Sequence, residues 1–336
     1  MYKGRPCRIH TYGDSFTQCH QVSDGETWQE YLAGHLGEPV LNFGMGGFGT
    51  YQAYRRMLRR ESSEIGAEYV MLYIWGDDHL RSLLRCRYML TAGWNRSQDR
   101  AEGVGRMFHG NFWSNVEMNL ETGKLEEHES RISERAELYR MTDVDWMLKN
   151  LSDDLALQMA LYTRNAIDEV DKTRLVKLAK ILEHPFQAEN ISRQTVGGLL
   201  DQYTFASTKY ILTKAKEFTE KHDKKLMVIL LDPHRVTRVL LEGGQRYDQE
   251  IVDFLKDNDF RVFDMNLVHA EDYKSFNLSV GDYFKRYYIG HYSPAGNHFF
   301  AYALKDQVVD WLDPKPLPYR NVTHESIDFK GYLPGQ

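Results

Sequence analysis

Continuous apolar runs along the chain show where strands form. The clearest is Lys225 to Leu231, and Glu68 to Trp75 is almost as continuous. Strands that are buried on both faces of a parallel sheet have this appearance. Three weaker segments also predict strands, namely Arg8 to Tyr12, Glu38 to Phe43 and Phe260 to Phe263.

Segments with apolar residues at helical spacing separate these predicted strands. They are Thr27 to Leu36, Tyr51 to Glu64, Phe205 to His222 and Asp248 to Lys256. Alternating strands and helices predict an α/β fold, a three-layer sandwich built around a parallel sheet. In folds of this class the functional site forms at the carboxyl ends of the strands.

The middle of the chain interrupts the alternation. Apolar and polar residues alternate on either side of Thr122-Gly123, which predicts a β-hairpin, and charged helical stretches follow it. We interpret this region as an insertion that serves as a lid or as a surface for homo-oligomer formation. The predicted division is an α/β core over 1–84 and 201–320, the insertion over 85–200 and a C-terminal tail over 321–336.

Charge and cysteine content narrow the class of protein. The 336 residues carry a net charge of −6, which disfavours nucleic acids and anionic membranes as partners. The cysteines, Cys7, Cys19 and Cys86, have neither a disulfide-framework spacing nor a zinc-site spacing. Neither an apolar signal segment nor an apolar run of the ~20 residues that cross a bilayer is evident. We therefore expect a cytoplasmic protein.

Residues with catalytic potential follow the predicted strands. Gly13-Asp14-Ser15 comes after the first strand, and the glycine-rich segment 44–49 comes after the second. Near the C-terminus, His291 stands just before a predicted helix. A serine that acts as a nucleophile needs a base of this kind within hydrogen-bond reach. We expect His291 to lie beside Ser15 at one edge of the sheet.

In order and spacing these segments resemble the SGNH, or GDSL-type, hydrolases. Gly13-Asp14-Ser15 matches the first block of that family, Asn42 to Gly47 matches the second, and His291 to Gly296 matches the last. The continuation from Phe48 to Gln52 is similar to the branch that contains polysaccharide O-acetyltransferases and O-acetyl esterases.

The resemblance implies acyl transfer on an ester, such as an O-acetylated carbohydrate, without a cofactor. It assigns Ser15 as the nucleophile and His291 as the base. It also implies that the backbone N–H groups of Ser15 and Gly47 stabilise the oxyanion. We further expect the substrate to contact three side chains, those of Asp14, Asp78 and Tyr288.

Two positions depart from the family pattern. Asp77 stands where the family has an asparagine that donates to the oxyanion. We assign Asp77 to the oxyanion hole, as an altered oxyanion residue or a substrate contact, and a carboxylate donates there only when it is protonated. Ile289 and Tyr288 stand where the family has an aspartate that orients the histidine. The resemblance then leaves a backbone carbonyl or a distant acid for this role, with Asp264 and Asp282 as the candidates.

Two alternative functions stay open, and these departures favour the first. One is a catalytically degenerate SGNH fold that serves as a binding or assembly protein. The other is a metal-dependent hydrolase, with a metal bound between two groups of polar residues, Asp77, Asp78 and His79 after one strand and Asp232 and His234 after another. The usual ligand spacings of metallohydrolases are missing, so we predict no metal site.

Overall fold

A parallel sheet forms the centre of the molecule. The computed structural model describes residues 7–90 and 110–320, and in these residues the main sheet has five strands in the order β2-β1-β3-β6-β7. The strands are β1 (Ile9–Tyr12), β2 (Val40–Asn42), β3 (Tyr69–Trp75), β6 (Lys225–Leu231) and β7 (Arg261–Asp264). This arrangement confirms the predicted α/β sandwich, while the predicted tail over 321–336 lies outside the described residues.

The first strand of the chain, β1, lies inside the sheet between β2 and β3, and this position determines where a ligand site can form. β1 pairs in parallel with both β2 and β3, and β3 pairs with β6 from Tyr69–Lys225 to Trp75–Leu231. The strand order reverses between β1 and β3, and ligands of doubly wound sheets bind at such a point. The segments that follow β1 and β3 therefore meet at the carboxyl edge.

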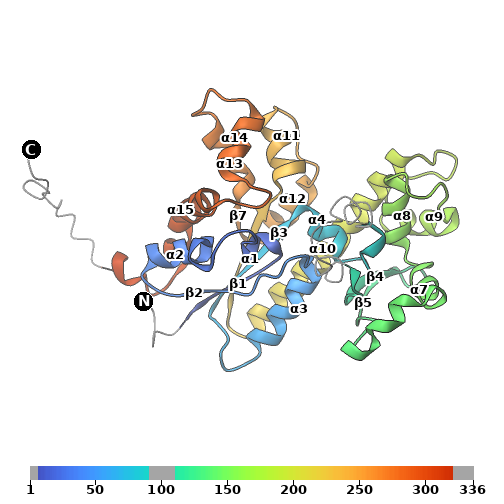
Figure 1. Ribbon diagram of the computed structural model, residues 1–336, viewed down its shortest axis with the longest axis horizontal. Helices are drawn as coiled ribbons and strands as arrows, with labels where there is room; N and C mark the ends of the chain where they lie inside the picture. The colour runs from blue at the N-terminus through green and yellow to red at the C-terminus, as the bar shows by residue number, and fades with distance from the viewer. Residues whose placement is uncertain (1–6, 91–109, 321–336) are drawn as a thin grey trace, which may run out of the picture.

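Helices cover both faces of the sheet (Figure 1). The layer on one face consists of α1 (Ser15–Gln18), α2 (Trp28–Leu36), α13 (Met265–Tyr273), α14 (Val280–Tyr287) and α15 (Pro294–Trp311). The layer on the other consists of α3 (Thr50–Glu61), α10 (Arg193–Lys221) and α12 (Gln249–Asp257). Short helical segments complete the core, namely η1 (Asp24–Glu26), α4 (Gly76–Arg81), η3 (Pro233–Thr237), α11 (Arg238–Leu241) and η4 (Leu317–Tyr319).

The insertion has a hydrophobic core of its own and lies to one side of the sheet (Figure 1). Its hairpin pairs β4 (Asn115–Asn119) with β5 (Lys124–His128), and Gly123 in the turn has the positive φ of 69° that glycine favours. Four helical segments follow, η2 (Arg135–Thr142), α7 (Val144–Leu151), α8 (Leu155–Thr163) and α9 (Lys172–Ile181). The predicted hairpin is thus present.

The predicted boundary at residue 200 falls inside the 29-residue helix α10. The first half of α10 packs in the insertion through Leu199 and Tyr203, and the second half packs on the sheet through Ile211 and Leu212. A continuous helix therefore joins the insertion to the core. Within residues 7–90 and 110–320, no helix combines the length and the apolar character needed to cross a membrane.

Candidate active site

A cavity of about 870 Å³ opens at the carboxyl ends of β1 and β3. Ser15, Gly47, Asp77 and His291 all line it. The insertion contributes to the same wall through Arg87, Leu90 and Arg164. The size suits a small polar molecule or one sugar unit, because ligand pockets commonly measure about 300–1,000 Å³.

Ser15 and His291 are in direct contact across 276 positions of sequence. His291 Nε2 lies 2.8 Å from Ser15 Oγ, which is hydrogen-bond distance. Ser15 is the first residue of α1, and the helix starts there because the Asp14 side chain accepts a hydrogen bond from Phe16 N at 2.9 Å. The structure therefore brings together the predicted nucleophile and the predicted base.

The other nitrogen of the His291 ring faces a glutamine. Gln21 Oε1 lies 3.1 Å from His291 Nδ1 and also accepts the backbone N–H of His291 at 2.9 Å. An amide oxygen only accepts hydrogen bonds, so Nδ1 carries the proton and Nε2 is left to accept from the Ser15 hydroxyl. Gly290 leaves space for this contact, since a Cβ there would lie 2.7 Å from Gln21 Oε1, and its φ of +112° also favours glycine.

Neither acid that we expected to orient His291 takes that role. Asp282 is exposed and pairs with Lys285 at 2.7 Å and with Ser279. Asp264 pairs with Arg246 and caps the start of α13. Gln21 was missed from the sequence, where a backbone carbonyl or a distant acid was considered for this role, whereas the acceptor is a side-chain amide that follows helix α1.

The environment of His291 favours the neutral ring. Burial, then the nearby His20 and Arg81 side chains, lower the pKa of His291 to about 4. The His20 ring stacks on the His291 ring with the centroids 5.4 Å apart. At neutral pH the imidazole is therefore unprotonated at Nε2 and ready to accept a proton.

The glycine-rich loop between β2 and α3 presents backbone N–H groups beside Ser15. Phe48 N donates to Met45 O at 3.1 Å, and Gly47 has a φ of 78°, which is typical of a type II turn. Gly46 N donates to Gln18 Oε1 at 2.6 Å, which ties this loop to α1. In the described part of the chain, the N–H groups of Ser15 and Gly47 donate to no other residue, so both are available to a ligand.

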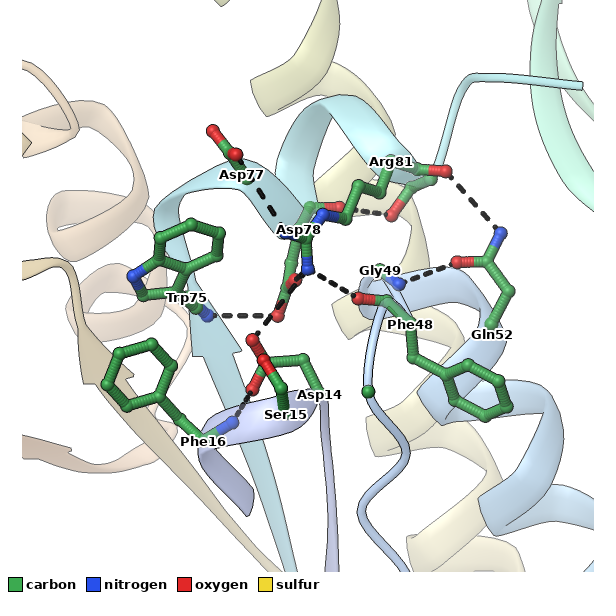
Figure 2. Close-up of polar contacts among 12 residues, drawn as sticks. Asp14, Ser15, Phe16, Phe48, Gly49, Gln52, Trp75, Asp77, Asp78 and Arg81 are labelled. Carbon is green, nitrogen blue, oxygen red and sulfur yellow. Dashed lines mark hydrogen bonds and ion pairs between the residues drawn. The ribbon is translucent and has the colours of Figure 1, made fainter. Parts of the chain in front are cut away.

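Asp77 lies at the rim of the cavity. Its side chain is 48% exposed, and its carboxylate lies 3.8 Å from Arg81 Nη2. Figure 2 shows the Arg81 guanidinium between Asp77 on one side and Asp14 and Asp78 on the other. A carboxylate oxygen accepts hydrogen bonds and has no N–H, so Asp77 does not supply the amide donor of the family's asparagine.

Asp14 and Asp78 do not line the cavity, contrary to our expectation that they contact the substrate. Asp14 is fully buried, and burial raises its pKa to about 6. Asp78 accepts from Trp75 N at 3.0 Å and from Arg81 Nη1 at 3.2 Å, and burial together with the Asp14 charge raises its pKa. Both carboxyl groups are buried, and they hold the start of α1, the start of α4 and the Arg81 side chain.

Tyr288 does not line the cavity either, because its side chain turns into the aromatic layer beside α15. Its hydroxyl lies 3.0 Å from His269 Nε2, and its ring stacks on Tyr292 with the centroids 4.6 Å apart. Tyr288 and Tyr292 form an isolated bridge on either side of His291. Tyr288 therefore supports the loop that carries the base.

The residues considered for a metal site do not converge. Asp77 and His234 line the cavity, but His79 Nδ1 faces the hydroxyl of Thr208 at 2.8 Å, and Asp232 accepts the backbone N–H groups that follow it. In residues 7–90 and 110–320, no group of three or more His, Cys, Asp or Glu side chains is arranged to hold a metal ion.

Comparison of the sequence with models of protein families and with curated proteins finds no match. The resemblance to the SGNH hydrolases therefore rests on the matched segments alone. Two residues beside them, Gln21 and Arg81, are new from the structure. Arg81 has a sequence signal, since it stands one helical turn after Asp77, whereas Gln21 has none.

Proposed function

We propose that this chain is a serine-dependent esterase or acyltransferase of the SGNH type. Its substrate is an ester, such as an acetylated carbohydrate. The observation that carries the proposal is the 2.8 Å contact between Ser15 Oγ and His291 Nε2 at the edge of a cavity. Support also comes from the neutral His291 ring and from the available N–H groups of Ser15 and Gly47.

The reaction starts when Ser15 Oγ attacks the ester carbonyl carbon and its proton passes to His291 Nε2. The carbonyl oxygen becomes an oxyanion, which the N–H groups of Ser15 and Gly47 stabilise. Collapse of the intermediate breaks the bond to the leaving alcohol, and His291 returns the proton to that alcohol's oxygen. The acyl group is then held on Ser15.

The second half reverses these steps with a new acceptor. Water or an acceptor alcohol enters the cavity and gives its proton to His291 as it attacks the acyl-serine. The intermediate collapses, and Ser15 leaves with the proton from His291. Gln21 holds the ring in the same tautomer throughout, because its oxygen contacts both Nδ1 and the backbone N of His291.

A fluorophosphonate probe tests the proposal, because it reacts with serines that are activated as nucleophiles. We expect the wild type to be labelled, labelling to be lost in Ser15→Ala, and His291→Ala to lose at least 100-fold in rate. Ser62→Ala is the matched control, since Ser62 is an exposed serine at the end of α3, and it should label like the wild type.

Circular dichroism and the melting temperature establish that each variant is folded. A folded wild type that the probe does not label, and that hydrolyses no acetate ester, would overturn the proposal. The alternative of a binding or assembly protein would then stand, and Asp77 would be its first sequence signal.

A further inference from the structure

The proposed reaction lacks one donor that its family pattern provides. The Ser15 and Gly47 N–H groups are two donors, and the third position carries Asp77, whose carboxylate repels an oxyanion. Removal of a single donor from such a site typically slows an enzyme by about 100-fold or more. A chain that keeps Ser15 and His291 in contact therefore needs another group at this place. The inference below rests on the proposed function.

Arg81 is a cation that lines the same cavity as Asp77. It stands at the end of α4, one helical turn after Asp77, and its side chain folds back so that the guanidinium carbon lies 4.8 Å from the centre of the Trp75 ring. Arg81 Nη1 donates to Phe48 O at 3.3 Å and to Asp78 Oδ1 at 3.2 Å. Phe48 directly follows Gly47, so the guanidinium is anchored to the loop that presents the Gly47 N–H (Figure 2).

The second terminal nitrogen of Arg81 is available to a ligand. Arg81 lines the cavity together with Ser15 and Gly47, and its side chain is 18% exposed. The nearest charged partner of Nη2 is Asp77 at 3.8 Å, beyond hydrogen-bond distance. Across the described ranges 7–90 and 110–320, Nη2 donates no hydrogen bond to another residue.

We propose that Arg81 is a catalytic residue that stabilises the oxyanion in place of the asparagine of the SGNH pattern. Its Nη2 supplies the N–H and its guanidinium supplies a positive charge. Asp77, on the other side of the guanidinium, holds the side chain in position. The site thus exchanges a neutral amide donor for a cation held between carboxyl groups.

Two observations support a role for the positive charge of Arg81 at the reacting groups. Burial, and for Asp78 also the charge of Asp14, raises the pKa of both carboxyl groups beneath Arg81, so they do not carry two full negative charges near neutral pH. In addition, the Arg81 charge is one of the causes, after burial and His20, that lower the pKa of His291. The guanidinium also lines the same cavity as Ser15 and His291.

Kinetics of Arg81→Gln on p-nitrophenyl acetate test the proposal. We expect kcat to fall by about 100-fold while KM changes less than threefold, because the interaction forms only as the oxyanion develops. The acid limb of the pH profile should also move to higher pH, since a positive charge near His291 is removed. Arg238→Gln is the matched control. Arg238 is partly exposed, contacts Glu242 at 3.9 Å and the Phe284 ring at 4.9 Å, and does not line the cavity, so the change should alter neither kcat nor the pH profile.

A second substitution restores the family's donor. Asp77→Asn places an amide at the third position, so the double variant Arg81→Gln/Asp77→Asn should be at least tenfold more active than Arg81→Gln. Arg81→Gln could fail to fold, because it leaves the buried Asp78 without its cation. In that case Arg81→Gln/Asp78→Asn is compared with Asp78→Asn, and we expect the same loss of kcat, about 100-fold, between these two variants.

The outcomes separate the two proposals. A folded Arg81→Gln, or the Asp78→Asn pair, that keeps kcat within threefold would overturn the role of Arg81. An increase in KM alone would overturn it as well, because it would make Arg81 a substrate-binding residue. If the fluorophosphonate probe did not label Ser15 in the wild type, the proposed function itself would be overturned instead.

Discussion

Two histidines of this chain form the same contact with different partners. His10 Nδ1 lies 2.7 Å from the carboxylate of Glu61, and His291 Nδ1 lies 3.1 Å from the amide oxygen of Gln21. The first pair is buried in the fold, between His10 in β1 and Glu61 at the end of α3, and the second borders the cavity. A histidine–carboxylate pair, which is commonly associated with catalysis, is present here in the structural region and absent at His291.

The difference between the two pairs lies in the other hydrogen-bond donors around the acceptor of each histidine. Glu61 also accepts from Tyr12 at 2.6 Å, from Ala67 N at 2.7 Å and from Lys224. Although burial opposes its ionisation, hydrogen bonds from His10, Tyr12 and Lys224 lower the pKa of Glu61 to about 2. A carboxylate with so many donors stabilises the fold, whereas the neutral Gln21 orients His291 and leaves its pKa low.

The largest expected effect is that of Glu61→Gln. This change removes the carboxylate that pairs with Lys224 at 3.0 Å and leaves buried donors poorly matched, so we expect a loss of about 3–5 kcal/mol in the free energy of unfolding at pH 7. Urea denaturation measures the loss. The rate of Ser15 labelling should remain at the wild-type value while the variant is folded, because Glu61 does not line the cavity.

The pH dependence of this loss provides a check. The folded-state pKa of Glu61 is lowered, so its contribution is present above the unfolded value near 4.5 and disappears as the pH falls toward 2. The wild type and Glu61→Gln should therefore converge in stability on acidification. A difference of equal size at pH 3 and pH 7 would contradict this account of Glu61.

A smaller effect with the opposite sign is expected for Asp14→Asn. Asparagine keeps the oxygen that accepts from Phe16 N and replaces Asp14 Oδ2, which has no hydrogen-bond partner in the described residues. Because burial raises the pKa of Asp14 to about 6, its ionised form is unfavourable at higher pH, and the variant should be more stable by about 1–2 kcal/mol at pH 7.5. Thermal unfolding measures the gain.

The gain from Asp14→Asn should also depend on pH. A raised folded-state pKa means that the wild type loses stability as the pH rises from about 4 through 6, while the protonated group has no such cost. The advantage of the variant should therefore disappear below about pH 4. A variant that is less stable than the wild type at pH 7.5 would mean that Arg81 needs the Asp14 charge.

The smallest expected effect is a shift of the pH profile in Gln21→Glu. Since the pKa of His291 is lowered to about 4, the wild-type kcat/KM should stay constant down to about pH 5 and then fall. A carboxylate at Gln21 would stabilise the imidazolium and move this limb up by about one pH unit. Gln249→Glu, an exposed change far along the chain, should leave it unchanged. An unmoved limb in Gln21→Glu would mean that His291 is not the base.

The sequence predicted the sheet well because buried parallel strands are continuous apolar runs. Lys225 to Leu231 is a strand with the predicted limits. Helix α10 was predicted from Phe205 and begins at Arg193 instead, where Ser192 caps it through Thr195 N. Gly197 and Gly198 weaken the helical signal there, and packing in the insertion outweighs their low propensity.

The site was predictable only where chain topology fixes it. Ser15 and His291 follow elements whose order in an α/β fold brings them to one edge. Gln21 was not predictable, because its direction depends on a positive φ of 82° that the sequence does not signal. Asp14 and Asp78 were expected to contact a ligand, yet both are buried, where Asp14 caps a helix and Asp78 pairs with Arg81. Aspartates at helix starts commonly have such a structural role, so the sequence does not distinguish it from ligand binding.

The length of α10 has a consequence for dissecting the molecule. At 29 residues it is a rod of roughly 43 Å, and its two halves shield different apolar interiors. Deleting residues 85–200 would remove the start of α10 and leave the rest of the helix on the sheet without its N-terminal cap and first turns. A shortened protein that keeps only the α/β core must therefore retain all of α10. The apolar side chains of its first half, which pack in the insertion, must then be replaced with polar ones.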